Sequence, residues 1–430
     1  MRVTFVQPYY RNVWENIGLG YIIAYCKQHF PGDLDVNFYQ GNFDSDAAIV
    51  RGAIDSDIVA FSATSPCFPP AVRLAAAIKA ENPNVRTVVG GWHVTALQEK
   101  ALNEFIDQIV VGEGEQAMLD ILQGNTDRIV RGTALPFSSL PWPDREAIKN
   151  HRTVNLCETM NGQRTTSFQA NRVCPTSCVF CAEKTMTGKF SRRLNPIRSR
   201  PVEDVCDEIA SVVEKYDLTY FKFVDATFDI TPQYVIDFCR EKIDRGIETE
   251  WECLIHASFC NEEMFYWLKE SNCNQINVGC ESGSPKILKQ VKKGTNVETI
   301  ENVFRWAKNY GINRRAFFIL GMPEEDREDL RMTEELIDRM EPDVVGFTIL
   351  CPYPGSSLYD HEKYGDQDWE QTDEYSNDFW RNKAFSNQEL KDWQAYFIDK
   401  YSDKLCERLD GDFGIAEDET NLVEHQTSSV

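Results

Sequence analysis

The chain has 430 residues, of which 42% are hydrophobic and 26% charged, a balance typical of a globular protein with two or three domains. Its 45 basic and 68 acidic residues give a net charge of −23, which excludes a broad surface for nucleic acid or anionic membrane, because such partners need a positive field. No stretch approaches the ~20 consecutive apolar residues that span a bilayer, and the N-terminus lacks the layout of a secretory signal. We therefore expect a cytoplasmic protein whose 14 cysteines are metal ligands or buried apolar residues and not disulfides.

Short apolar runs alternate with amphipathic stretches over residues 1–125. The apolar runs predict strands at Arg2–Gln7, Asp35–Tyr39, Asp57–Thr64, Thr87–Gly91 and Gln108–Val111. The amphipathic stretches between and after these strands predict helices at Leu19–Phe30, near Ala47–Ile54, just before Pro83 and at Glu115–Leu122. Strand–helix alternation at this spacing predicts an α/β domain with a Rossmann-like, doubly wound parallel sheet. Ligands of such sheets bind beyond the carboxyl ends of the strands.

A linker is predicted over residues 126–160, because it contains the proline- and serine-rich stretch Thr133–Asp144. A second alternating series follows over residues 161–362. Its predicted strands are Thr165–Asn171, Tyr220–Val224, Glu250–Ile255, Gln275–Gly279, Arg315–Leu320 and Asp343–Leu350. Six strand–helix units are fewer than the eight of a closed barrel, so we expect a partial (β/α)6 barrel.

The C-terminal part is predicted to be a small helical region over residues 363–410, with one aromatic helix at Asn387–Leu409. Aromatic side chains between Tyr364 and Phe385 are more typical of packing than of substrate contact. Residues 411–430 are acidic and lack a core pattern, so we expect them to be disordered.

Three cysteines form the motif C-x3-C-x2-C directly after the first strand of the second domain: Cys174, Cys178 and Cys181. This position is the top face of a βα barrel, where chemistry usually takes place. Three thiolates on one tight loop can hold three irons of a 4Fe-4S cluster and leave the fourth iron open to a small chelating molecule. A zinc site with Cys157 or Cys206 as fourth ligand is an alternative, although zinc usually takes two ligand pairs. Most of the other eleven cysteines are expected to pack in the core.

The loop and the partial barrel closely resemble those of the radical S-adenosylmethionine (SAM) enzymes, over roughly Thr165–Asp360. The resemblance implies that a 4Fe-4S cluster on the three cysteines binds SAM and cleaves it reductively to a 5′-deoxyadenosyl radical. It also implies SAM contacts for residues near each strand end, namely Phe180 and Asp225, then Glu281 with Ser282, and finally Gly321 with Pro323.

Two features of these segments leave other interpretations open. Glu281 and Ser282 could instead cap the helix that starts at Ser284–Pro285. The chain also departs from the family pattern, with His256 where relatives often carry Arg, and Glu324–Asp326 where they often read Gly-Glu-Thr.

Small residues follow the strands of the first domain, and they allow two interpretations. A dinucleotide site needs G-x-G-x-x-G after the first strand, but Gly18 and Gly20 lack the third glycine. A large flat ligand over the strand ends needs residues without bulk, which are found at Ser62, Thr64, Gly90, Gly91, Gly112 and Gly114. The segments GGWHVT and VVGEGEQAMLDIL resemble cobalamin-binding domains, and the resemblance covers Arg2–Leu122. It implies that Trp92, His93 and Glu113 also lie at a cobalamin site.

The signature D-x-H-x-x-G of cobalamin proteins that donate a histidine to cobalt is absent, so we expect no histidine on the lower face of the metal. His93 could bind cobalt or the propionamide groups, but a structural role in its loop is the favoured interpretation. Glu113 and Glu115 could equally be ordinary acidic residues at a helix N-terminus.

Together these resemblances lead to the hypothesis of a cobalamin-dependent radical SAM methyltransferase. It would transfer a methyl group from methylcobalamin to an unactivated carbon of a small molecule or peptide. It would draw electrons from a low-potential donor such as flavodoxin or ferredoxin. Three alternatives remain: a cyclase or rearrangement enzyme with the same cofactors, a tRNA methylthiotransferase, and a non-catalytic cobalamin sensor. The tRNA alternative is disfavoured because only Cys26 and Cys67 precede Cys157, too few for a second cluster, and because the chain is acidic.

Overall fold

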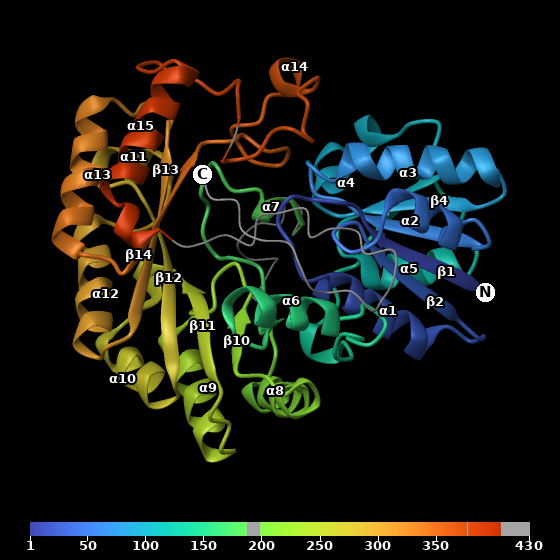
Figure 1. Ribbon diagram of the computed structural model, residues 1–430, viewed down its shortest axis with the longest axis horizontal. Coiled ribbons are helices and arrows are strands. Elements are labelled where there is room, and N and C mark those ends of the chain that lie inside the picture. The colour runs from blue at the N-terminus through green and yellow to red at the C-terminus, as the bar shows by residue number, and fades with distance from the viewer. Residues whose placement is uncertain (187–197, 376, 406–430) are drawn as a thin grey trace. The chain divides into compact units, whose positions relative to one another are not determined.

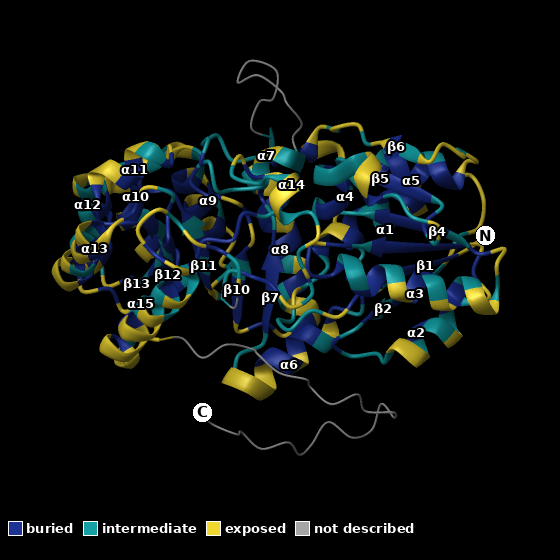
Figure 2. Cartoon of the chain, turned by 90° about the horizontal axis from the view of Figure 1, so that it is seen from above, coloured by how far each residue is buried: buried dark blue, intermediate teal, exposed yellow. Residues whose placement is uncertain are grey.

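The computed structural model describes residues 1–186, 198–375 and 377–405. The described residues form two compact units, one from Met1–Thr133 with Pro143–Lys149, the other from Ala134–Trp142 with residues 150–405. Buried residues concentrate in the strands of each unit and exposed residues on the outer faces of the helices (Figure 2). The tail that we expected to be disordered, 411–430, lies outside the described residues.

The first unit is built on a parallel sheet of six strands in the order β2-β1-β3-β4-β5-β6. Its strands are β1 (Arg2–Gln7), β2 (Asp35–Gln40), β3 (Ile58–Ser62), β4 (Arg86–Gly90), β5 (Gln108–Val111) and β6 (Ile129–Arg131). The first five confirm the predicted strands, whereas β6 falls in the predicted linker. The order reverses between β1 and β3, which is the topological switch point of a doubly wound sheet.

Helices cover both faces of this sheet. They are α1 (Ile17–His29), α2 (Asp46–Ala53), α3 (Phe68–Glu81), α4 (Trp92–Leu97) and α5 (Gly114–Leu122), with a 3-10 turn at Gln98–Ala101. Helices α1 and α5 pack together on one face, and α2 and α3 pack together on the other (Figure 1). The doubly wound arrangement predicted from the sequence is therefore confirmed.

The second unit contains a parallel sheet whose strands follow chain order, β7-β10-β11-β12-β13-β14. The strands are β7 (Thr165–Phe168), β10 (Tyr220–Phe223), β11 (Glu250–Ile255), β12 (Cys273–Glu281), β13 (Asn313–Leu320) and β14 (Val344–Ile349). Strands β7 and β14 form the two edges and do not pair with each other. Sequential order with unpaired edges is the arrangement of a partial barrel, and it confirms the predicted (β/α)6 fold.

The helices of this unit are α6 (His151–Asn161), α7 (Glu183–Met186), α8 (Val202–Tyr216), α9 (Pro232–Asp244), α10 (Glu262–Glu270), α11 (Pro285–Gln290), α12 (Val297–Asn309), α13 (Arg327–Met340), α14 (His361–Tyr364) and α15 (Asn387–Lys400). Short 3-10 turns lie at Phe137–Ser139, Ala257–Phe259 and Ser402–Lys404. Helix α13 begins with a capping box, in which Asp326 and Asp329 each accept a backbone N–H from the other residue. Helix α15 corresponds to the helix predicted over Asn387–Leu409, and it is shorter than predicted because its regular turns end at Lys400.

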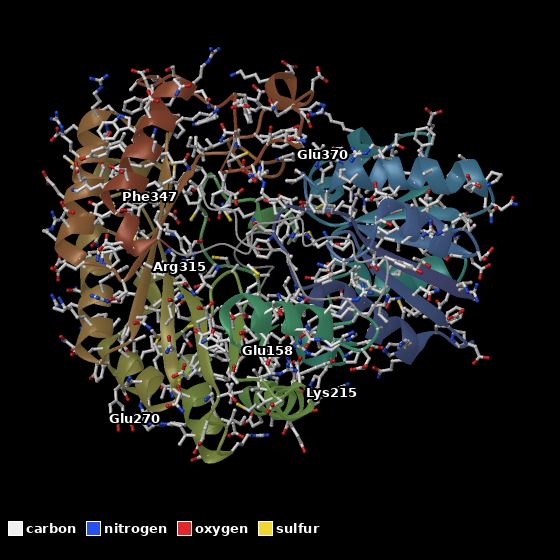
Figure 3. All side chains as sticks on the ribbon, in the orientation of Figure 1. Glu158, Lys215, Glu270, Arg315, Phe347 and Glu370 are labelled. Carbon is white, nitrogen blue, oxygen red and sulfur yellow. The ribbon has the colours of Figure 1, made fainter. Side chains whose placement is uncertain are left out.

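Residues of the barrel strands alternate between two environments, as expected for a period of two. On β13, Arg314, Ala316 and Phe318 are buried, whereas Arg315, Phe317 and Ile319 are half-buried and Asn313 is exposed. Figure 3 labels Arg315 on β13 and Phe347 on the adjacent strand β14. Phe347 stacks on Phe397 of α15 with 5.0 Å between ring centroids, so the buried face of the strands packs against helices.

The segment after β14 lies along the outer edge of this strand. The backbone N–H of Ile349 donates to the carbonyl of Glu374 at 2.8 Å, and Val345 forms a parallel bridge with Leu405. The side-chain amide of Gln394 donates to the carbonyl of Phe347 at 3.0 Å. The edge of the sheet is therefore covered by the chain's own C-terminal segment.

Candidate functional site

The cysteine loop lies between β8 (Asn171–Arg172) and α7, and β8 pairs antiparallel with β9 (Arg198–Ser199). Neither short strand was predicted. Within the loop the Thr176 hydroxyl lies 3.0 Å from Sγ of Cys174 and 3.6 Å from Sγ of Cys178. The backbone N–H of Glu183 donates to Sγ of Cys181 at 3.4 Å. One short loop therefore holds all three thiols, and polar groups contact each of them.

Backbone hydrogen bonds fix the loop from both sides. The N–H of Val179 donates to the carbonyl of Val291 at 3.0 Å, and the carbonyl of Val179 accepts from the N–H of Ser357 at 2.9 Å. Val291 follows α11 and Ser357 lies in the loop after β14. The neighbour of Cys178 is therefore anchored to two different parts of the barrel, and the loop is held in place without any ligand.

Asp225, which follows β10, supports the start of this loop. Its carboxylate accepts from the N–H of Ala170 at 3.1 Å and also from the N–H of Asn171. Burial raises the pKa of Asp225 to about 7, although these backbone donors oppose the shift. In the structure this carboxylate thus holds the chain that leads into the cysteine loop, and contact with the SAM amino group remains a prediction.

The donor set of the loop fits an iron–sulfur cluster. Burial raises the pKa of the Cys174 thiol and raises that of Cys181 to about 12, so the thiols need a cationic ligand to become thiolates. Within residues 1–186, 198–375 and 377–405, no three His, Cys, Asp or Glu side chains converge where one metal ion could bind. An iron–sulfur cluster does not require the three side chains to converge on one point, because each thiolate binds a different iron atom of the cluster.

The cysteines considered as zinc ligands are core residues. Cys206 lies on α8 and is completely buried, and Cys157 lies on α6 and is 5% exposed. Cys206 belongs to the apolar core of the barrel, together with Cys239, Cys253, Cys273 and Cys280. These side chains behave as small hydrophobic residues, as the sequence predicted for most of the cysteines.

Glu281 ends β12 with a left-handed backbone, φ +64°. Its carboxylate pairs with the ammonium group of Lys293, Oε1 to Nζ 2.6 Å, and both side chains are about nine-tenths buried. Ser282 is completely buried, and its hydroxyl lies 3.3 Å from that of Thr333 on α13. The helix cap is neither of these residues but Ser284, whose Oγ accepts from the N–H of Ile287.

The turn after β13 is built around Gly321, whose φ of +85° favours glycine. Its N–H donates to Oε2 of the buried Glu325 at 2.6 Å, and its carbonyl accepts from the indole N–H of Trp380 at 2.7 Å. Burial raises the pKa of Glu325 to about 8. Residues 324–326 are where the sequence departs from the family pattern. Glu325 within this segment has a structural role, because its carboxylate closes the turn that carries Gly321 and Pro323.

Phe180 and Pro323 lie in less enclosed positions. Phe180 is partly buried and packs against the core of the barrel, beside the anchored Val179. Pro323 is partly buried in the turn after β13. Their predicted contacts with adenine remain predictions.

In the first unit, the predicted cobalamin residues lie along one edge of the sheet. Ser62 at the end of β3 is in register with Gly90 at the end of β4, and β5 follows as the next strand before Gly112 and Gly114. A Cβ at position 90 would meet its nearest atom at 3.6 Å, and one at position 112 would have 3.8 Å. Gly90 and Gly112 therefore place no side chain at the carboxyl edge, where ligands of such sheets bind, whereas Gly114 is required by packing, because a Cβ there would lie 2.5 Å from Cδ1 of Ile22.

Gly91 and His93 organise the adjoining loops. A Cβ at position 91 would lie 2.6 Å from the carbonyl oxygen of Ala63, and the φ of +104° also favours glycine. The ring of His93 stacks on Phe68 with 4.3 Å between centroids, and Nδ1 lies 3.1 Å from Oγ of Ser65. Burial lowers the pKa of His93 to about 4, so the ring is neutral at physiological pH. These contacts give His93 a structural role.

Three further candidates occupy helix starts or the loop after β3. Trp92 is the first residue of α4 and Glu113 the residue before α5, and both are partly buried. Thr64 is exposed, and its hydroxyl contacts the Cys67 thiol at 3.3 Å. Glu115, in the first turn of α5, is 3% exposed.

Three residues of the barrel site escaped sequence reasoning: Lys293, Glu325 and Trp380. Lys293 is one of two adjacent lysines, and nothing local distinguishes it from the exposed Lys292. Trp380 contacts Gly321 across 59 residues of sequence, so no motif could indicate the pairing. Only Glu325 carried a signal, because it stands in a turn where the family pattern is broken.

Each of the two domains predicted from the sequence matches a known protein family. A model described as the Radical SAM superfamily matches residues 169–337, and a model described as the B12 binding domain matches residues 7–122. The two matches define a protein that joins a B12-binding sheet to a radical SAM barrel. The chain carries both a radical SAM domain and a B12-binding domain, and it is a radical SAM enzyme. These domains imply a 4Fe-4S cluster, SAM and cobalamin as its cofactors, which confirms the predicted set.

Several proteins are similar to the chain over most of its length. An uncharacterized methyltransferase of Pyrococcus horikoshii is 27% identical over 366 residues, covering 80% of this chain and 78% of that protein. The anaerobic magnesium-protoporphyrin IX monomethyl ester cyclase of Rubrivivax gelatinosus is 28% identical over 405 residues, covering 85% and 70%. The structure of the radical SAM methyltransferase TsrM from Kitasatospora setae, with cobalamin and a 4Fe-4S cluster bound, superposes with a TM-score of 0.66 at 16% identity, covering 83% and 76%. The last similarity supports the fold.

Among the residues described, no helix is both long and apolar enough to span a membrane.

Proposed function

We propose that this protein is a cobalamin-dependent radical SAM methyltransferase acting on a carbon that has no activating group. The observation that carries the proposal is that one chain combines a three-thiol loop on a partial barrel with a sheet whose carboxyl edge is lined by small residues. When bound, the three cofactors supply a 5′-deoxyadenosyl radical and a transferable methyl group. The relative from Pyrococcus horikoshii is named a methyltransferase, which supports this choice of reaction.

The chain's own residues would hold and orient these cofactors. Cys174, Cys178 and Cys181 would bind three irons, and the anchored backbone of Val179 would keep the loop at a fixed distance from the barrel. The Gly321 turn, closed by Glu325, would face the nucleoside part of SAM. A low-potential donor such as flavodoxin or ferredoxin would supply the electron, and the reaction would take place in the cytoplasm.

The predicted cobalamin residues would form a floor for a flat ligand. Ser62, Gly90 and Gly112 would let the ligand approach the backbone, because none of them projects a bulky side chain over the strand ends. His93 would act on the loop and not on cobalt, since its ring already contacts Phe68 and Ser65. The lower face of cobalt would then carry no histidine from this loop.

The test is anaerobic turnover with SAM that carries either an ordinary or a trideuterated methyl group. The reconstituted protein is given cobalamin, a chemical reductant, and an extract of small molecules and peptides as substrate source. Methyl transfer predicts product pairs in the accurate-mass spectrum that differ by three deuterium atoms. It also predicts formation of both 5′-deoxyadenosine and S-adenosylhomocysteine. The matched control is the same protein reconstituted without cobalamin.

A second candidate is a cyclase or rearrangement enzyme that uses the same cofactors. The relative from Rubrivivax gelatinosus, which is named a cyclase, supports this alternative. It predicts 5′-deoxyadenosine without S-adenosylhomocysteine and without any deuterium-labelled product. That outcome would overturn methyl transfer and leave the cofactor assignment intact.

A further inference from the structure

A buried ion pair lies beside the cysteine loop, and the roles described so far do not explain it. Nζ of Lys293 and Oε1 of Glu281 are 2.6 Å apart, with only 10% and 8% of their side chains exposed. Removing an ammonium and a carboxylate from water is costly, and stability alone seldom requires such a pair. The structure makes room for it at Gly279, where a Cβ would lie 2.5 Å from the carboxylate and 2.7 Å from the ammonium group.

The turn that carries Lys293 is fixed by the loop after β11. Nε2 of His256 lies 2.8 Å from the carbonyl of Lys293, and the Ser258 hydroxyl donates to the carbonyl of Gly294 at 2.7 Å. Nδ1 of His256 accepts from the N–H of Ser258, so the proton is on Nε2 and donates to Lys293. Burial lowers the pKa of His256 to about 4, which keeps this single neutral form at physiological pH.

The same turn is joined to the cysteine loop. The N–H of Val179, the residue after Cys178, donates to the carbonyl of Val291, two residues before Lys293. Burial alone lowers the pKa of Lys293, but the attraction of the Glu281 carboxylate, 2.6 Å away, is the largest of the effects that outweigh burial and raise the pKa. The ammonium group is therefore charged, and the turn that carries it is hydrogen-bonded to the residue beside a predicted cluster ligand.

We propose that Lys293 and Glu281 set the reduction potential of the cluster, with His256 as the residue that positions Lys293. Reduction adds one electron, taken from an external low-potential donor protein or from dithionite, and makes the cluster more negative. A buried cation nearby favours the reduced form, and a buried anion opposes it, because little solvent screens either charge. Lys293 raises the potential, and Glu281 limits the rise.

The experiment is a redox titration of the reconstituted protein without SAM, followed by electron paramagnetic resonance of the reduced cluster. Lys293→Met should lower the ratio of reduced to oxidised cluster at a fixed potential at least tenfold relative to wild type, which corresponds to about 59 mV for one electron. Glu281→Gln should shift the potential in the opposite direction. Lys293→Arg should stay close to wild type, because it keeps the charge.

The matched control is Lys292→Met, which removes the adjacent but exposed lysine and should leave the potential unchanged. His256→Leu should shift the potential in the same direction as Lys293→Met, because it releases the turn. Iron and sulfide content are measured for each variant so that the potentials refer to fully loaded clusters.

The double variant Lys293→Met/Glu281→Gln leaves no buried charge unpaired, so it should fold and return the potential toward wild type. A potential that is unchanged in Glu281→Gln would overturn the proposal. So would an equal shift in Lys292→Met and Lys293→Met. If Lys293→Met alone fails to load the cluster, Glu281→Gln and the double variant decide the question in the same way. The result does not depend on methyl transfer, since no turnover is measured.

Discussion

The buried carboxylate of Glu325 should make the stability of the barrel depend on pH. Burial raises its pKa to about 8 in the folded chain, against an ordinary value of 4.5. Between these values the folded state binds a proton that the unfolded state has released, so stability falls as the pH rises. The contribution of protonated Glu325 to the free energy of unfolding is fully present below about pH 4.5 and is lost as the pH passes through about 8.

Glu325→Gln removes this dependence while keeping the contacts. The amide oxygen of glutamine can accept from the N–H groups of Gly321 and Met322, as Oε2 of Glu325 does at 2.6 and 3.3 Å. Each pH unit in this range costs the wild type about 1.4 kcal/mol. From about pH 5.5 to about pH 7.5 the variant should therefore gain about 2.7 kcal/mol relative to wild type.

Urea unfolding of the apoprotein at both pH values, followed by tryptophan fluorescence, measures this difference. Comparing variant with wild type cancels the contributions of the other buried groups, because they are the same in both proteins. The control is Glu324→Gln, which changes the exposed neighbouring carboxylate and should show no pH-dependent difference. A Glu325→Gln difference that is equal at both pH values would refute the reasoning.

Three further substitutions test the site. Cys178→Ala should prevent assembly of the full cluster, measured as iron and sulfide per chain, whereas Cys206→Ala should load normally; equal loss in both would restore the zinc alternative. His93→Gln should leave the absorption bands of bound cobalamin in place, and a displaced spectrum would mean that His93 binds cobalt. Trp380→Phe should lower the free energy of unfolding by about 1–3 kcal/mol, because the carbonyl of Gly321 loses its buried partner; an unchanged urea midpoint would contradict this.

The strands of both sheets were predictable because each is a short apolar run bounded by turn residues. The periodic signal is absent from the short strands β6, β8 and β9, which contain two or three residues each. Such strands form because the fold places another strand of the same protein beside them, as with β6 beside β5 and β8 beside β9. A local sequence pattern does not encode pairing of this kind. The end of α15 was misplaced for a related reason, since apolar residues continue past Lys400 after the regular helix has ended.

The cluster ligands could be predicted because their chemistry requires three thiols at fixed spacing. The roles of Asp225 and Ser282 could not, because a carboxylate or hydroxyl at a strand end looks the same in sequence whether it faces a ligand or a backbone N–H. The Lys293–Glu281 pair was equally hidden. Its two residues are twelve apart, and only the path of the chain through α11 brings them together.

The segment that covers β14 affects whether a truncated form of the barrel would aggregate. A bare strand edge offers unpaired backbone groups to any other chain, and this is a common origin of aggregation. Here Glu374 and Leu405 bond to β14 where a seventh strand would otherwise add. A fragment that ended before Ser386 would retain all six strands and the three cysteines, yet it would lose α15 and the bridge at Leu405. Insolubility of such a fragment would report the exposed strand edge and the apolar face that α15 covers, and it would say nothing about the chemistry of the site.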